Sequence, residues 1–205
     1  MSPERAYQTN AGITWAGVFG SSSISLTCDG YWNTVRDKIV AIPTMFIWSM
    51  RNVGKVTMLG CDLTASYNGK VTDWLRLRTG VNYSYQYAVD VTDPQAKNYR
   101  HQIAYTPRHC GSGSLVLEMP WCNVGYTVNA VGERYTLSQN TPAYRTAPYA
   151  DHALSINRTF EFGKMHNWKL HLSAEALNLG NVNYEIIKYY PMPGRNYRLT
   201  IRIAY

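Results

Sequence analysis

The sequence has no long apolar run and little charge. No stretch approaches the roughly 20 consecutive apolar residues that a membrane-spanning helix needs. Charged residues make up 16% of the chain, against about 25% of an average soluble domain. The mean hydropathy of −0.31 is nevertheless moderate. Strands that alternate polar and apolar residues explain both values, because averaging hides the alternation.

Residue patterns typical of catalytic or metal centres are also missing. The four cysteines have no CxxC spacing, and the five histidines are dispersed. Asp151 and His152 are adjacent, so on a strand they point to opposite faces. The Gly-Ser segment 111–114 lacks the Lys-Ser/Thr of a phosphate-binding loop. We therefore expect no enzyme, no metal and no cofactor.

The net charge of +7 comes from Lys and Arg residues that form no run. This scatter disfavours nucleic acid as a partner. A basic surface, a lumen that attracts anions and contact with anionic lipid all remain open. The first residues also lack a charged-then-apolar leader. For an exported protein, we therefore expect the true N-terminus to lie upstream.

Aromatic residues are abundant but unevenly chosen, with 17 Tyr and 6 Trp against 4 Phe. Tyr and Trp are favoured at membrane–water boundaries, where one end of the ring is apolar and the other is wet. Segment 196–205 places aliphatic residues between tyrosines on one face, and Arg198 and Arg202 on the other. The aliphatic face comprises Tyr197, Leu199, Ile201, Ile203 and Tyr205. This pattern is typical of a strand that crosses an outer membrane.

Period-two alternation predicts nine strands, and the connections between them alternate in length. The predicted strands are 5–18, 22–35, 54–68, 72–91, 98–106, 113–130, 148–162, 168–178 and 195–205. Short turns are predicted at 19–21, 68–70 (an Asn-Gly turn), 107–112 and 163–167. Longer loops are predicted at 36–53, 92–97, 131–147 and 179–194. Short turns at one end and long loops at the other are typical of an outer-membrane barrel, with the last strand ending on the periplasmic side.

The predicted fold is therefore all-β, an antiparallel up-and-down transmembrane β-barrel occupying 1–205 as one domain. Nine strands is an odd number, and an open sheet would leave unpaired backbone groups in lipid. We expect these to be the C-terminal strands of a larger barrel, with the missing strands on the N-terminal side.

The end of the chain resembles TonB-dependent receptors. Segment 178–185, Asn-Leu-Gly-Asn-Val-Asn-Tyr-Glu, is similar to the family's NLFD-x-x-Y-E stretch, with Gly180 and Asn181 replacing the usual Phe-Asp. Segment 190–195 is similar to its YPMPGR segment. The matching motif residues are Asn178, Leu179, Tyr184, Pro191, Pro193, Gly194 and Arg195. Segments 37–44 and 48–56 look like a strand–loop–strand of receptors from the Bacteroidota, closer to siderophore and cobalamin receptors than to glycan importers.

The resemblance implies the C-terminal part of a barrel of about 22 strands closed around an N-terminal plug. It implies a Gram-negative outer-membrane location and uptake of a scarce nutrient such as a ferric siderophore, haem or cobalamin. The implied partners are outer-membrane lipid and lipopolysaccharide, the missing N-terminal half and plug, an inner-membrane energy-coupling complex reached through that plug, and the barrel-assembly machinery. Tyr197, Leu199, Ile201, Ile203 and Tyr205 would carry the assembly signal.

Candidate substrate residues lie in long loops and on the lumen wall. They are Phe46 and Trp48 in the first loop, Glu133, Arg134 and Tyr135 in the third, and Arg76, Arg78 and Arg198 on the wall. Lumen solvation and cross-strand pairing are the alternative roles for the three wall arginines. Two other functions remain open, a non-functional truncated or split receptor and a soluble β-sandwich ligand-binding module.

Overall fold

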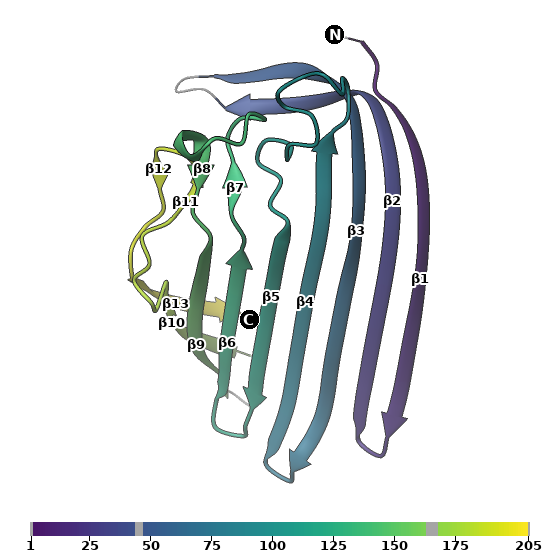
Figure 1. The fold of residues 1–205 in the computed structure, drawn as a ribbon. Coiled ribbons are helices and arrows are strands. Elements are labelled where there is room, and N and C mark those ends of the chain that lie inside the picture. The colour runs from purple at the N-terminus through teal and green to yellow at the C-terminus, as the bar shows by residue number, and fades with distance from the viewer. Residues whose placement is uncertain (1, 44–46, 163–167, 205) are drawn as a thin grey trace.

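Nine long strands form one curved antiparallel sheet. The structure, a computed structural model, describes residues 2–43, 47–162 and 168–204. Within these ranges the strand order is β1-β2-β3-β4-β5-β6-β9-β10-β13. The strands are β1 (Arg5–Phe19), β2 (Ser22–Pro43), β3 (Trp48–Thr72), β4 (Leu75–Asp90), β5 (His109–Glu118), β6 (Asn123–Val131), β9 (Tyr149–Phe162), β10 (Trp168–Leu177) and β13 (Asn196–Ala204). Figure 1 shows a curved wall in which β10 and β13 turn behind β6 and β9. The predicted all-β, up-and-down topology is confirmed.

Smaller elements lie in the long loops. Strand β7 (Arg134–Tyr135) pairs with β8 (Arg145–Thr146), and a 3-10 turn, η1 (Pro142–Tyr144), precedes β8. Strand β11 (Glu185–Ile187) pairs with β12 (Tyr190–Pro191). In the part of the chain that the structure describes, no helix is long and apolar enough to cross a membrane.

Turn lengths segregate to opposite ends of the sheet, as the sequence predicts. The β1–β2 turn is Gly20–Ser21, where Gly20 has a φ of +59° that suits glycine. The β3–β4 and β5–β6 turns, at 73–74 and 119–122, lie at the same end, drawn at the bottom of Figure 1. The long loops 91–108, 132–148 and 178–195 lie at the other end. Strand β13 runs back toward the short-turn end.

Two strand predictions are wrong. The number of long strands among the described residues is still nine, because one predicted strand is absent and another is two strands. Segment 98–106 is a series of turns, with Arg100 and Tyr105 at positive φ, and its apolar Ile103 is buried instead of alternating in a strand. Segment 113–130 is a hairpin of β5 and β6, because the chain turns at Pro120 and Trp121 instead of continuing as one strand.

Three connection predictions are also wrong. The predicted loop 36–53 is largely strand, since β2 and β3 continue pairing in the same register past Asp37 (φ 55°) up to Pro43 and Trp48. The predicted Asn-Gly turn lies inside β3, where a Cβ on Gly69 would meet Ser22 Oγ at 2.2 Å. The predicted turn 107–112 instead contains the start of β5. The predicted turn 163–167 lies outside the described residues.

The buried core lies at the long-loop end. Val56 of β3 and Ala88 of β4 are 0% and 2% exposed, because Ile103 of the following loop packs on them. Elsewhere most large apolar side chains of the sheet are exposed. The fold is therefore a wall with two solvent-accessible faces, which a soluble sandwich would not leave open.

Candidate functional site

The outward face of the sheet is an apolar belt. Ile13, Leu199, Ile201 and Ile203 are 72%, 71%, 62% and 64% exposed. Cross-strand register continues this face from Ile13 through Cys28 and Leu63 to Tyr83. Such a continuous exposed apolar surface fits contact with lipid.

Aromatic residues border the belt at both ends. Near the short turns, Trp74 and Trp121 stack with centroids 5.5 Å apart, and Trp168 pairs with Phe162 in register. Toward the long-loop end, Tyr7 and Tyr197 are 74% and 75% exposed. These are the positions of the two aromatic girdles of a membrane barrel.

The opposite face is polar. One row crosses seven strands in register, Thr14, Thr27, Thr64, Asn82, Ser112, Asn129 and Asp151. Thr64 Oγ1 donates to Asn82 Oδ1 over 3.1 Å, and Asn82 Nδ2 donates to Ser112 Oγ over 3.3 Å. A hydrogen-bonded polar row is expected of a face that lines a water-filled lumen.

A hollow of about 460 Å³ lies on this polar face. Asp29, Asp62, Asn33, Tyr31 and Gln86 contribute to its lining. A Cβ on Gly12 would lie 1.9 Å from Asp29 Oδ1, and one on Gly60 would lie 2.4 Å from the Tyr31 ring. These two glycines therefore leave the space that Asp29 and Tyr31 occupy.

The loop after β4 folds inward over the lumen side. Besides the Ile103 contact, Gln102 N donates to Asn140 Oδ1 over 2.6 Å, and Asn140 Nδ2 donates back to Gln102 O over 2.9 Å. This reciprocal pair joins loop 91–108 to loop 132–148. Thr92 Oγ1 accepts from Lys55 N over 2.8 Å and fixes the start of the loop on β3.

A cavity of about 690 Å³ opens between these two loops. Lys97, Asn98, His101, Ser138 and Thr141 are among its lining residues. The His101 ring approaches Ser138 O through Nδ1 at 3.2 Å, so Nδ1–H donates and Nε2 remains available as an acceptor in the neutral ring. The cavity therefore offers a cation, an amide and hydroxyl groups to a polar ligand.

The last loop is organised by a buried asparagine. Asn178 is 3% exposed; its Nδ2 donates to Val182 O and Pro193 O over 2.9 and 3.1 Å, and its Oδ1 accepts from Val182 N over 2.9 Å. Arg195 donates to Leu179 O from Nε over 3.0 Å and from Nη2 over 2.6 Å. The family motif residues therefore fold this loop.

Tyr184 fastens the last loop to β9. Its hydroxyl donates to Asp151 Oδ2 over 3.0 Å, and its ring stacks on Tyr149 with centroids 4.1 Å apart. Burial, followed by the Asp151 carboxylate, raises the pKa of Tyr184 to about 12.

This raised pKa predicts a loss of stability in alkali. Because the folded pKa lies above the ordinary 10, the contribution of Tyr184 is complete below pH 10 and is lost as pH rises through about 12. We expect the stability difference between wild type and Tyr184→Phe to shrink across that window. Heat-induced unfolding followed on a gel from pH 8 to 12 measures it. A difference that stayed constant across the window would contradict the prediction.

Comparison with known proteins decides the family. A family profile described as "TonB dependent receptor-like, beta-barrel" matches residues 1–181. The chain belongs to the TonB-dependent receptor family. The resemblance seen in the sequence is thereby confirmed, although the motif residues from Tyr184 to Arg195 lie beyond the matched residues.

Solved structures share the fold at low identity. The ferric preacinetobactin receptor BauA from Acinetobacter baumannii is 14% identical with a TM-score of 0.67, covering 99% of this chain and 30% of that one. The copper transporter OprC is 17% identical with a TM-score of 0.69, covering 98% and 31%. The siderophore receptor PiuA from A. baumannii is 18% identical with a TM-score of 0.69, covering 96% and 28%. No curated protein sequence matched the chain.

The TonB-dependent receptor segment thus spans about 30% of the length of the structures it matches. Barrels of this family lie in the outer membrane of Gram-negative bacteria, and the chain is an outer-membrane protein of that kind. Its relatives are transporters and receptors.

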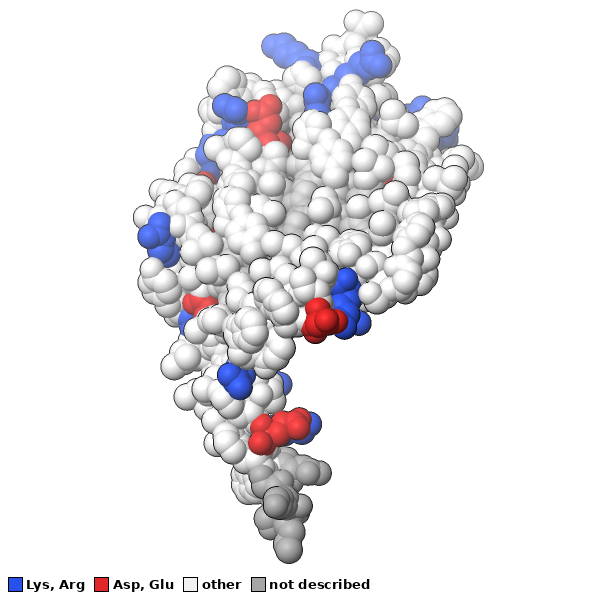
Figure 2. Space-filling view, turned by 90° about the horizontal axis from the view of Figure 1, so that it is seen from below, with Lys and Arg blue, Asp and Glu red and all other residues white. Residues whose placement is uncertain are grey.

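The structure does not gather the predicted substrate residues of this receptor segment into one site. Arg78 pairs with Glu118 and Arg198 pairs with Glu175, both on the lumen face. Figure 2, seen from below, shows few charged residues, with acidic and basic side chains touching in places. Arg76 lies on the same face toward the short-turn end, far along β4 from the loops.

The third-loop candidates hold the loop together. Glu133 pairs with Arg145 at 2.6 Å. Arg134 is 4% exposed, donates through Nη2 to Glu185 O and to Ile186 O (the latter over 2.9 Å), and so joins two loops. Tyr135 O accepts from Tyr105 N over 2.7 Å. Through these contacts, all three residues stabilise the conformation of the loop.

The remaining candidates can be placed only in part. Phe46 and Tyr205 lie outside the described residues. The backbone of Trp48 pairs with Pro43. Sequence reasoning missed His101, because segment 98–106 is predicted as a strand, and it did not single out Asn140 within the predicted loop 131–147. Across the described ranges, no group of three or more His, Cys, Asp or Glu could hold a metal ion.

Proposed function

We propose that the chain is the C-terminal part of the barrel of an outer-membrane transporter. The plug and the N-terminal strands would come from residues outside the chain, and the full barrel would import a scarce nutrient such as a ferric siderophore, haem or cobalamin. The supporting observation is a polar lumen wall whose loop end is covered by two inward-folded loops. A cavity lined mostly by polar residues lies between these loops. Open edges at β1 and β13 fit further strands, because unpaired backbone groups are costly in lipid.

The proposal extends to partners. The apolar belt would contact outer-membrane lipid and lipopolysaccharide, and the alternating strand β13 would carry the signal read by the barrel-assembly machinery. An inner-membrane energy-coupling complex would act through the plug. A truncated receptor without transport activity shares the fold and differs only in the outcome of the test. The exposed apolar belt argues against a soluble binding module.

Complementation tests assembly. The chain is exported alone and together with the plug and N-terminal strands of a TonB-dependent receptor, and the outer-membrane fraction is run on a gel with and without heating. A heat-modifiable band only when both parts are present supports a split barrel. A soluble, folded product from the chain alone would overturn the proposal.

We predict that the cavity between loops 91–108 and 132–148 recognises the substrate. In a complemented receptor, we expect Lys97→Ala combined with His101→Ala to reduce uptake of a radiolabelled ferric siderophore by about tenfold or more, because a cationic and a hydrogen-bonding group are lost. Gln95→Ala, on the same loop with an exposed side chain, is the control. Equal uptake by all variants would remove the cavity from the transport pathway. Absence of uptake in the wild-type assembly would favour the non-functional fragment.

A further inference from the structure

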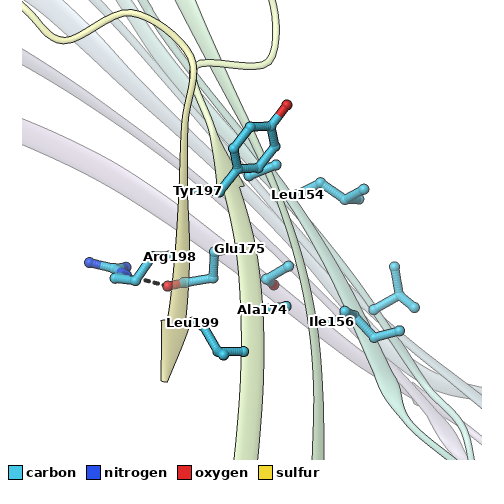
Figure 3. Close-up of a pocket in the computed structure, with 10 residues that line it drawn as sticks. Leu154, Ile156, Ala174, Glu175, Tyr197, Arg198 and Leu199 are labelled. Atoms are coloured by element: carbon cyan, nitrogen blue, oxygen red, sulfur yellow. Dashed lines mark hydrogen bonds and ion pairs between the residues drawn. The ribbon is translucent and has the colours of Figure 1, made fainter. Parts of the chain in front are cut away.

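An apolar groove of about 580 Å³ lies in the lipid-facing belt, a volume within the range of ligand sites. Ala174 of β10 lies between Ile156 of β9 and Leu199 of β13 in register, and Ala176 lies between Leu154 and Tyr197. Two short side chains between longer ones leave a trough that runs along β10. Figure 3 shows Ala174, Tyr197 and Leu199 on one side of the sheet, with the Arg198–Glu175 pair directed to the other.

A basic side chain lies beyond the groove, toward the short-turn end. Arg158 comes two residues after Ile156 on β9, on the same outward face, and pairs in register with Leu172. Its guanidinium lies 4.6 Å from the centroid of Phe160, which is closer to the short turn. Among the ion pairs of the described residues, none involves Arg158.

An outward arginine within an apolar belt requires a partner. A charge that faces lipid costs free energy that increases with its depth in the bilayer. Stacking on Phe160 directs the guanidinium toward the short-turn interface, as snorkelling requires. The short turns of an outer-membrane barrel face the periplasm. The anion available at that depth is the phosphate of a phospholipid in the inner leaflet.

We propose that this surface binds one inner-leaflet glycerophospholipid. Arg158 holds the headgroup phosphate in a charge-assisted hydrogen bond, and one acyl chain lies in the trough over Ala174 and Ala176, pointing toward the middle of the bilayer. The sidedness of Arg158 favours this lipid over lipopolysaccharide, whose phosphates lie at the long-loop interface. The proposal rests on the outer-membrane location and is independent of any transported substrate.

Native mass spectrometry with phosphatidylglycerol tests the site. The complemented barrel is recovered from outer membranes in detergent and titrated with dioleoylphosphatidylglycerol, and the lipid-bound fraction is counted. Folding of each variant is checked by heat-modifiable migration. We expect Arg158→Gln to reduce the bound fraction about threefold or more, since the charge-assisted bond is lost. Ala174→Phe is expected to do the same by filling the trough.

Two variants on matched positions serve as controls. Arg202→Gln removes an arginine at a similar height on the lumen face, where Arg202 pairs in register with His171. Ala65→Phe adds the same bulk on the lipid face of β3, between Leu26 and Val81. Both should bind phosphatidylglycerol as wild type does. A phosphatidylglycerol bearing a diazirine on its acyl chain should label peptides of β10 and β13.

Three results would overturn the proposal. The first is that Arg158→Gln binds phosphatidylglycerol as well as wild type does, and the second is that Arg202→Gln loses as much binding as Arg158→Gln. The third is that lipid A at equal concentration displaces phosphatidylglycerol. If Ala174→Phe does not fold, Arg158→Gln and the labelling decide. Recovery of the chain only from the soluble fraction would overturn the membrane location as well. Loss of uptake with lipid binding retained would count against the transport proposal alone.

Discussion

Leu199→Arg is expected to remove most of the folded chain from the outer-membrane fraction. Leu199 is 71% exposed on the apolar face of β13, between Tyr197 and Ile201, so it lies within the belt. An arginine on the lipid face costs about 2–4 kcal/mol near the middle of the bilayer. That cost corresponds to a roughly 30- to 1,000-fold shift in the folding equilibrium. Heat-modifiable migration of the complemented barrel measures the folded fraction.

The neighbouring residue supplies the control. Thr200 lies next to Leu199 on β13 and pairs in register with Ser173 on the polar face. Thr200→Arg is therefore expected to fold nearly as well as wild type, because its charge reaches the hydrated lumen. Equal folding of the two variants would mean that the faces are not divided between lipid and water. Reversal of their order would mean that lumen and lipid faces are assigned the wrong way round.

The division into two faces could be predicted because it is a local property. Side chains alternate along any strand, so the pattern from Tyr197 to Ile203 already separates the apolar face from the face of Arg198 and Arg202. The exposures in the structure agree with it. The same reasoning places Leu63, Ala65 and Val81 on one continuous surface once the strands pair.

Strand ends could not be predicted, because they depend on contacts between distant residues. Asn68-Gly69 has the composition of a turn, yet Ser22 packs on Gly69 from the neighbouring strand and β3 continues to Thr72. Segment 98–106 alternates like a strand, yet Ile103 is buried against Val56 and Ala88. Its burial depends on the inward fold of the loop, which no local pattern encodes.

The candidate site was predictable only in its general location. Long loops were expected to carry it, and the loop cavity lies between two of them. Which loop residues contact a substrate could not be predicted, because polar residues that stabilise a loop and polar residues that face a cavity look alike in sequence. Arg134 is buried and its guanidinium joins two loops by hydrogen bonds, whereas His101 lines the cavity. Asn140, at φ 51°, is the kind of residue that tolerates the left-handed region, and that preference is the one signal that was available.

The second large effect is expected at Asn178, where the family motif begins. Its side chain makes three hydrogen bonds inside the last loop while only 3% exposed. Asn178→Ala leaves Val182 N, Val182 O and Pro193 O without this partner, and each buried unsatisfied group costs about 1–3 kcal/mol. Asn178 also has a φ of 49°, which alanine adopts less readily than asparagine. We expect proteolytic cleavage within 178–195 to become at least about tenfold faster.

Two further variants separate the hydrogen bonds from the backbone conformation. Asn178→Gly accepts the positive φ but makes no side-chain bonds, so cleavage nearly as fast as in Asn178→Ala would show that the bonds dominate. Cleavage as slow as in wild type would instead assign the effect to backbone strain. Asn183→Ala, at an exposed position of the same loop, should cleave like wild type. Because Asn178 binds both Val182 and Pro193, loss of its hydrogen bonds should also release Arg195 from Leu179 O. The start of β13 would then detach from the loop. The motif is therefore linked to the membrane strand that follows it.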